Sequence, residues 1–230
     1  MHGQNDSLKA NRFRFFLGDE IKFQSKSVKV DSAELDNFQL TNPFFINYTK
    51  ASAYLGNLGC ALRTDYFGLN NDLNFYYRNN YYSSYHYDEH PAGFDASRNI
   101  HSMMEYYHGA KKEQLFQFNH SQRLSKNFGF GLDYKNIISP SFYKRELTIS
   151  KSFDGYIVFE TSNHRYSAFA RYIVNKTDNN INGGLADAAS LETTNGIKVK
   201  TLPVNLDDAQ WLTKQTNYVF KQQFNFKIAS

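Results

Sequence analysis

The sequence predicts an all-β fold, an antiparallel up-and-down transmembrane β-barrel of six to eight long strands that is incomplete within these 230 residues. Aromatic residues reach 17%, although hydrophobic residues amount to only 41%, and the mean hydropathy is −0.61. Long segments alternate apolar and polar residues, as expected for strands that turn one face to lipid and the other inward. A helical membrane span would need about 20 consecutive apolar residues, and the sequence contains no such run.

The clearest element is a hairpin over residues 113–135. In residues 127–135 the aromatic and leucine side chains take one parity, and glycines and charged residues take the other. Because successive side chains of a strand point to opposite faces, this pattern predicts one apolar and one polar face. Phe116 and Phe118 repeat the pattern in the preceding strand, and residues 124–126 form the tight turn between the two.

The same alternation predicts strands at residues 100–108, 113–123, 127–136, 146–160, 164–175 and 214–228. Strands average about 5–6 residues in soluble proteins, whereas a tilted membrane strand needs about 9–11. The predicted lengths therefore favour a membrane barrel over a soluble sheet.

The predicted connections alternate in length. Residues 124–126 and 161–163 form short turns, whereas 137–145 and 176–213 form long loops, and only the turn at 109–112 is short on the long-loop side. Outer-membrane barrels have short periplasmic turns and longer extracellular loops. Trp211 ends the longest loop, where an anchor at the membrane interface is expected.

The N-terminal part has a different character. We expect residues 1–99 to form an irregular segment that plugs the barrel or lies on its periplasmic side, and residues 100–230 to form the partial barrel. Residues 65–91 are dense in Tyr and Asn and alternate poorly, which predicts irregular chain lying over or inside another element. Residues 1–7 are polar and do not resemble a signal peptide, so we expect a mature or fragmentary chain.

Strand parity predicts two sets of site residues. Charged residues predicted to face the lumen are Asp133, Lys135, Arg165, Arg171, Lys221 and Lys227. Residues predicted to face lipid are Phe116, Phe118, Phe128, Phe130, Leu132, Tyr218, Phe220, Phe224 and Phe226. The lumen set is net basic, which predicts a weak preference for anionic solutes. The alternative is that these bases pair with acids on other strands.

No motif predicts an enzyme, a cofactor or a metal site. Residues 86–90 fit the H-x-x-E-H pattern of zinc proteases, but that pattern needs a helix, and Pro91 disfavours one. His120 and Ser121 are adjacent on one strand, point to opposite faces and cannot form a catalytic dyad. Cys60 is expected to be a small buried residue. Lys and Arg are scattered along the chain, so nucleic acid is not an expected partner.

A set of short motifs occurs in a fixed order along the chain: YLGNLG at 54–59, GAKKEQ at 109–114, HSQ at 120–122, GLDY at 131–134 and NGG at 182–184. Through this set the chain resembles the β-barrel porin family of Bacteroidota outer membranes, over roughly residues 36–190. The resemblance implies an exported Gram-negative outer-membrane barrel for transport of small solutes, without an assigned catalytic site. Members of that family are longer and supply enough strands to close a barrel, so we expect a fragment.

The sequence therefore predicts a porin-like barrel for passive passage of small solutes across the cell outer membrane. Expected partners are outer-membrane lipid, small solutes, and either a second copy of the chain or envelope proteins. One alternative is a plugged outer-membrane barrel with a structural or partner-binding role. A second is a soluble β-sandwich that binds carbohydrate through surface tyrosines.

Overall fold

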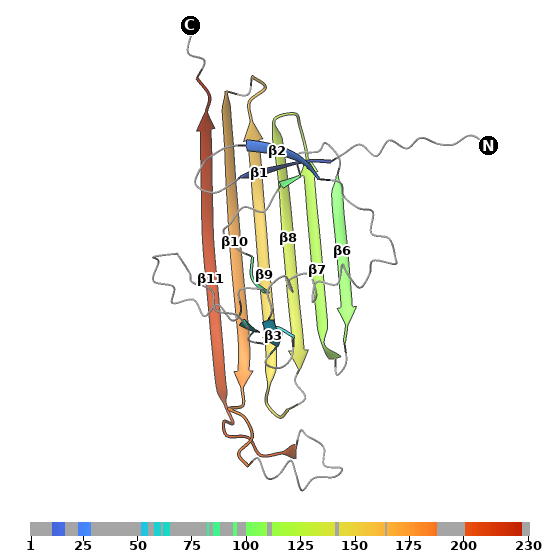
Figure 1. Ribbon diagram of the computed structural model, residues 1–230, viewed down its shortest axis with the longest axis vertical. Coiled ribbons are helices and arrows are strands. Elements are labelled where there is room, and N and C mark those ends of the chain that lie inside the picture. The colour runs from blue at the N-terminus through green and yellow to red at the C-terminus, as the bar shows by residue number, and fades with distance from the viewer. Residues whose placement is uncertain are drawn as a thin grey trace, which may run out of the picture.

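The structure is a computed structural model that describes residues 11–16, 23–28, 52–54, 58–60, 62–64, 82, 85–87, 94–95, 100–109, 112–140, 143–163, 165–187 and 201–226. Its main element is a tall six-stranded sheet (Figure 1). The strands are β6 (His101–His108), β7 (Gln114–Arg123), β8 (Phe128–Pro140), β9 (Leu147–Glu160), β10 (Tyr166–Ile181) and β11 (Ala209–Phe224).

Each strand of this sheet pairs antiparallel with its neighbour in the sequence, in the order β11-β10-β9-β8-β7-β6. This arrangement confirms the predicted all-β, antiparallel up-and-down fold. The sheet is not closed, because β6 and β11 are its outer strands and do not pair with each other. An open sheet is consistent with an incomplete barrel.

All six predicted strands are present, and three of them extend further than expected. β8 continues to Pro140, β10 to Ile181, and β11 begins at Ala209, so both predicted long loops are shorter than residues 137–145 and 176–213. Residues 176–180, which the structure adds to β10, are polar on both faces, so they show no alternation although their backbone is paired. β10 ends just before Gly183 and Gly184, whose φ angles of +67° and +83° only glycine adopts readily.

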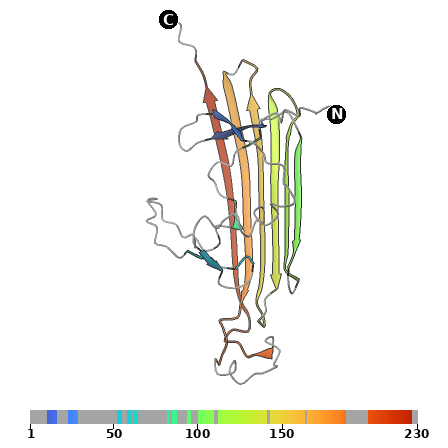
Figure 2. The same ribbon diagram turned by 45° about the vertical axis from the view of Figure 1, so that its right-hand side comes forward.

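Two small sheets lie in the region predicted to be irregular. β1 (Asn11–Phe16) pairs with β2 (Phe23–Val28) and with β5 (Phe94–Asp95), and β3 (Ser52–Tyr54) pairs with β4 (Leu62–Thr64). Figures 1 and 2 show both small sheets over the same face of the large sheet. The division of the chain at residue 99 remains a prediction.

The register divides the large sheet into two faces. We call the inner face the one that carries Gln117, Lys135, Ser152, Asn175 and Gln215 in one row across β7–β11. The outer face carries Phe118, Tyr134, Phe153, Val174 and Thr216 in the next row. Every other residue of a strand therefore shares a face with one of these two sets.

The main apolar core of the described chain lies on the inner face. Tyr85 packs against Leu115 of β7 and Ile137 of β8, and all three are buried. The partly buried Leu58, Tyr82 and Tyr107 pack against this cluster. Tyr82 and Tyr85 therefore lie over the inner face. Of residues 65–91 only 82 and 85–87 are described, so the prediction for the rest of that range lies outside the described residues. No helix in the part of the chain that the structure describes is long and apolar enough to cross a membrane.

Candidate functional site

The inner face of the sheet is polar, and much of it is buried. Eleven buried polar or charged residues belong to it: Ser121, Ser139, Thr148, Ser150, Ser152, Asp154, Ser167, Arg171, Asn175, Thr177 and Asn179. Buried polar groups are tolerated when they are hydrogen-bonded. The contacts on this face therefore define the candidate site.

The strongest contact on the inner face is the ion pair between Arg171 of β10 and Asp154 of β9. The Arg171 Nε donates to both carboxylate oxygens of Asp154, at 2.8 and 3.0 Å, and Nη2 donates to Oδ2 at 2.5 Å. The two side chains are only 4% and 2% exposed. A buried guanidinium that binds a carboxylate through two nitrogens is held in one geometry. The pair therefore holds the side chains of β9 and β10 in a fixed arrangement on the inner face.

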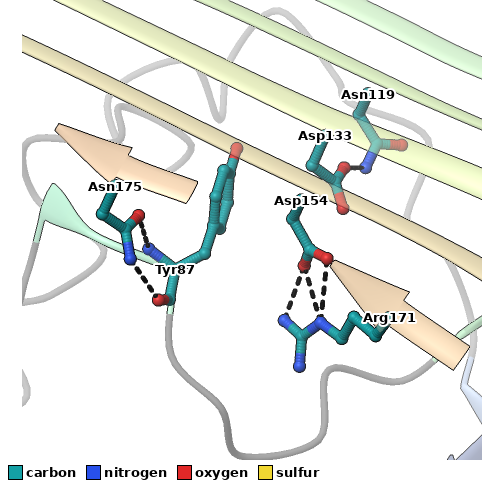
Figure 3. A network of polar contacts seen from close by, with 6 residues as sticks. All are labelled: Tyr87, Asn119, Asp133, Asp154, Arg171 and Asn175. Atoms are coloured by element: carbon teal, nitrogen blue, oxygen red, sulfur yellow. Dashed lines mark hydrogen bonds and ion pairs between the residues drawn. The ribbon is translucent and has the colours of Figure 1, made fainter. Parts of the chain in front are cut away.

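A second carboxylate lies beside this ion pair. Asp133 of β8 is directly opposite Asp154, and its carboxylate accepts a hydrogen bond from the Asn119 amide of β7 (Figure 3). Lys135 follows two residues later on the same face of β8. Two acids and two bases are therefore concentrated on three adjacent strands, β8, β9 and β10.

The segment 85–87 is hydrogen-bonded onto the same face. The Asn175 side-chain amide donates to the Tyr87 carbonyl at 2.9 Å, and its Oδ1 accepts from the Tyr87 backbone N–H at 3.0 Å (Figure 3). His86 Nε2 lies 2.7 Å from Thr177 Oγ1, and Ser152 donates to the Tyr85 carbonyl at 3.3 Å. We call this set of contacts the 85–87 clasp. It satisfies backbone groups of an irregular segment that would otherwise be buried without partners.

The Tyr87 ring connects the clasp to the charged cluster. Lys135 Nζ lies 5.2 Å from the ring centroid, within the range of a cation–π contact. Burial raises the pKa of the Tyr87 phenol above its ordinary value, and the nearby Asp133 and Asp154 carboxylates raise it further. The phenol therefore stays neutral at physiological pH.

The predicted lumen-facing charges fall into three groups. Asp133, Lys135, Arg171 and Lys221 lie on the inner face. Arg165 lies in the turn before β10 and is exposed, and Lys227 is outside the described residues. That these residues line a lumen stays a prediction.

The predicted lipid-facing residues gather on the outer face. Eight of them lie there within strands: Phe116, Phe118, Phe128, Phe130, Leu132, Tyr218, Phe220 and Phe224. The ninth, Phe226, follows the end of β11 and is exposed. Tyr218 and Phe220 are 79% and 65% exposed, so no described element covers this part of the face. A β-sandwich would need a second sheet there. Contact of this face with lipid stays a prediction.

Several inner-face residues were missed by sequence reasoning, most importantly Asp154. Across β6–β11 the inner face carries four acids and four bases: Glu105, Asp133, Asp154, Glu160, Arg123, Lys135, Arg171 and Lys221. Formal charge on the inner face of these strands is therefore balanced, and Arg171 has its acid within the sheet. The expected preference for anionic solutes stays a prediction. Asp154 shares its parity with Ser150 and Ser152, which is the signal that could have found it.

Trp211 also differs from its expected role. β11 begins at Ala209, so Trp211 is part of the strand and lies on the inner face opposite Asn179. Its ring packs edge-on against Tyr82, with 5.1 Å between the ring centroids. The residue anchors N-terminal chain to the sheet, because its parity turns it away from the outer face.

The remaining motifs do not assemble a catalytic or metal site within the described ranges, where no group of three metal-binding side chains occurs. Of the H-x-x-E-H residues only His86 is described, and it contacts Thr177 in the clasp. His120 Nδ1 lies 2.7 Å from Ser102 Oγ on the outer face. Cys60 is half-buried, with Sγ 3.5 Å from Thr148 Oγ1.

The fold and its two faces define a class, that of antiparallel up-and-down β-sheets of the barrel type, polar on the inner face and apolar on the outer face. The chain matches the model of the family described as "Putative porin" over residues 14–230, and it belongs to that family. No curated protein and no solved structure matches the chain.

Proposed function

We propose that this chain forms part of an outer-membrane β-barrel through which small solutes pass passively. The observation that carries the proposal is the segregation of the two faces: buried ions, amides and hydroxyls on one, and exposed Phe and Tyr on the other. A soluble sheet buries its apolar face, whereas a membrane barrel directs it to lipid and keeps polar groups inside. Membership of the porin family supports the same function.

In this mechanism the sheet forms part of the wall of a water-filled passage, and the protein performs no chemical step. Outer-face aromatics hold the sheet in the bilayer, and inner-face hydroxyls, amides and charges keep a water-filled passage wetted. The equal number of acids and bases on the inner strands favours weak charge selectivity. Lys221 lies on the inner face outside the Arg171–Asp154 pair, so Lys221→Glu in the reconstituted protein should shift the reversal potential towards cations.

The test is conductance in a planar bilayer. Protein purified from outer membranes should give discrete conductance steps, and Tyr218→Cys and Asn217→Cys in a Cys60→Ser background separate the two faces. A water-soluble thiol reagent should reduce conductance when it reacts at position 217 and leave conductance unchanged at position 218. Protein that remains soluble without detergent and never inserts would overturn the proposal.

The second candidate is a barrel plugged by its own N-terminal region, with a structural or partner-binding role. The 85–87 clasp favours it, because it fixes chain against the buried part of the inner face. Removing residues 1–99 separates the two functions. An open porin conducts with or without these residues, whereas a plugged barrel conducts only after they are removed.

A further inference from the structure

The outer face of β8–β11 is divided into an apolar band and a lysine row. On β10 the band runs from Tyr166 to Val174 through alternate residues, a nine-residue span of about 26 Å along the strand at about 3.3 Å per residue. This matches the 9–11 residues with which a tilted strand crosses a bilayer. The next outer-face residue is Lys176.

Lys176 lies directly opposite Lys151 of β9 on one side and Lys214 of β11 on the other. These three residues form the lysine row, and all three are exposed. Like charges directly opposite each other on adjacent strands destabilise a sheet. Within the described strands the nearby outer-face acid is Asp178, which accepts a hydrogen bond from Gln210 at 2.7 Å. The lysine row thus has an excess of positive charge where the apolar band ends.

An apolar pocket lies beside the lysine row on β8–β11, nearer to the N-terminal end of β10. It has a volume of about 560 Å³, and its lining includes the small residues Gly131, Gly155 and Ala170 among larger neighbours. Tyr172 and Tyr218 form one side, with ring centroids 5.0 Å apart, and Phe220 lies beyond Ala170. The row of Tyr134, Phe153 and Val174 lies between Tyr172 and the lysines, and Phe153 of this row also lines the pocket.

We propose that this part of the outer face binds a membrane lipid with an anionic phosphate headgroup. The phosphate binds the lysine row, and one acyl chain extends along the face over Phe153 and Val174 into the pocket. The proposal rests on the membrane location proposed above, because only then does the apolar band meet acyl chains. A phosphate supplies the charge that the lysine row lacks, and the long lysine stems reach it while their ammonium groups remain at the interface.

The geometry favours a lipid over a soluble phosphate or a protein partner. The lysine row and the pocket are separated along the strands, so one ligand that fills both needs a charged head and a long apolar tail. β10 leaves the apolar band at Lys176 and continues towards the longer connections. The site would therefore take lipid from the leaflet on that side.

The experiment uses the protein reconstituted in phosphatidylcholine nanodiscs and titrated with fluorescent phosphatidic acid. The variant Lys151→Gln, Lys176→Gln, Lys214→Gln should bind the probe roughly tenfold more weakly at low salt, since each lysine near the surface contributes to anionic-lipid attraction. The matched control Lys112→Gln, Lys126→Gln, Lys144→Gln removes three exposed charges elsewhere and should bind like the wild type. Equal weakening by both triple variants, or by neither, would overturn the proposal.

Two further arms test the pocket and the lipid. Ala170→Phe fills the pocket and should weaken probe binding while leaving the lysine row intact. Glycerol 3-phosphate, which has no acyl chain, should not displace the probe at equal concentration; equal displacement would sink the lipid assignment. Co-flotation of the wild type with phosphatidylcholine vesicles reports membrane insertion separately. Insertion without a preference for phosphatidic acid rejects the lipid site alone, whereas failure to insert rejects the proposed function.

Discussion

The two faces of one sheet achieve order in different ways. The inner face is organised by specific polar contacts: the Arg171–Asp154 pair, the Asn119–Asp133 hydrogen bond and the 85–87 clasp. The outer face is organised by ring contacts between aromatics, such as the half-buried Tyr166 with the exposed Phe224, whose ring centroids are 4.6 Å apart. The same backbone therefore presents hydrogen bonds and ion pairs on one face and aromatic contacts on the other. We therefore expect the effect of a substitution on stability or membrane insertion to depend more on the face that the residue occupies than on the residue type.

The largest effect is expected at the buried ion pair. Asp154→Leu leaves the Arg171 guanidinium buried without its carboxylate and should destabilise the folded sheet by about 3–5 kcal/mol. The measurement is the shift of the thermal unfolding transition in detergent. The double variant Asp154→Leu, Arg171→Met should recover most of the loss. If it remains as unstable as the single variant, the cost lies in packing and the ion-pair explanation is wrong.

A lysine placed on the outer face should have the next largest effect. Phe220→Lys should disfavour membrane insertion by about 2–4 kcal/mol if the position faces the bilayer midplane. Its neighbour Val219 lies on the inner face, so Val219→Lys should insert much more readily. Flotation of both variants with phosphatidylcholine vesicles measures the difference. Equal insertion of the two would remove the basis for calling the outer face lipid-facing.

Breaking the clasp should have a smaller effect, confined to the N-terminal chain. Asn175→Ala leaves the Tyr87 backbone N–H and carbonyl without their partner, at a cost of about 1–3 kcal/mol. Limited proteolysis should then cut near residues 85–87 faster than in the wild type. Asn180→Ala, an exposed outer-face asparagine on the same strand, is the control and should leave cleavage unchanged. Slow cleavage in both would show that other contacts hold the segment.

The smallest effect is expected at Gly131, on the inner face. A Cβ there would lie 2.4 Å from the Tyr156 ring, so Gly131→Ala should displace that side chain without unfolding the sheet. The change should appear as altered near-ultraviolet circular dichroism, with the unfolding transition shifted by no more than about 1 kcal/mol. A loss as large as that of Asp154→Leu would mean that the ring cannot move.

The alternation of apolar and polar residues predicted most of the fold. Where this alternation fails, the strand ends and Asp154 were not predicted. In β8, Phe128, Phe130 and Leu132 alternate with Gly129 and Gly131, so the face of each residue follows from parity alone. In β9 the second half is apolar on both faces, from Tyr156 to Phe159, which hides the parity of Asp154. The last residues of β10 are polar on both faces and show no period. The end of β10 was therefore not predicted because it lacks alternation, and Asp154 was not predicted because the residues after it are apolar on both faces.

Contacts across the sequence could not be predicted. Asn175 and Tyr87 are 88 residues apart, and nothing in the local pattern of either marks it as a partner of the other. The irregular, tyrosine-rich character of residues 65–91 predicted that this chain would lie over another element. It did not indicate which strand would receive it, because that choice depends on the shape and hydrogen-bonding groups of a face that exists only after the sheet has formed.

In the six-stranded sheet the order of the strands in space is the same as their order in the chain. Each hairpin can therefore dock onto an existing edge as it arrives, without any segment having to thread through a loop or wait for a distant partner. Contacts between sequence neighbours close short loops and form quickly. The sheet can accordingly be extended strand by strand, with the growing edge always offering the backbone groups that the next strand needs.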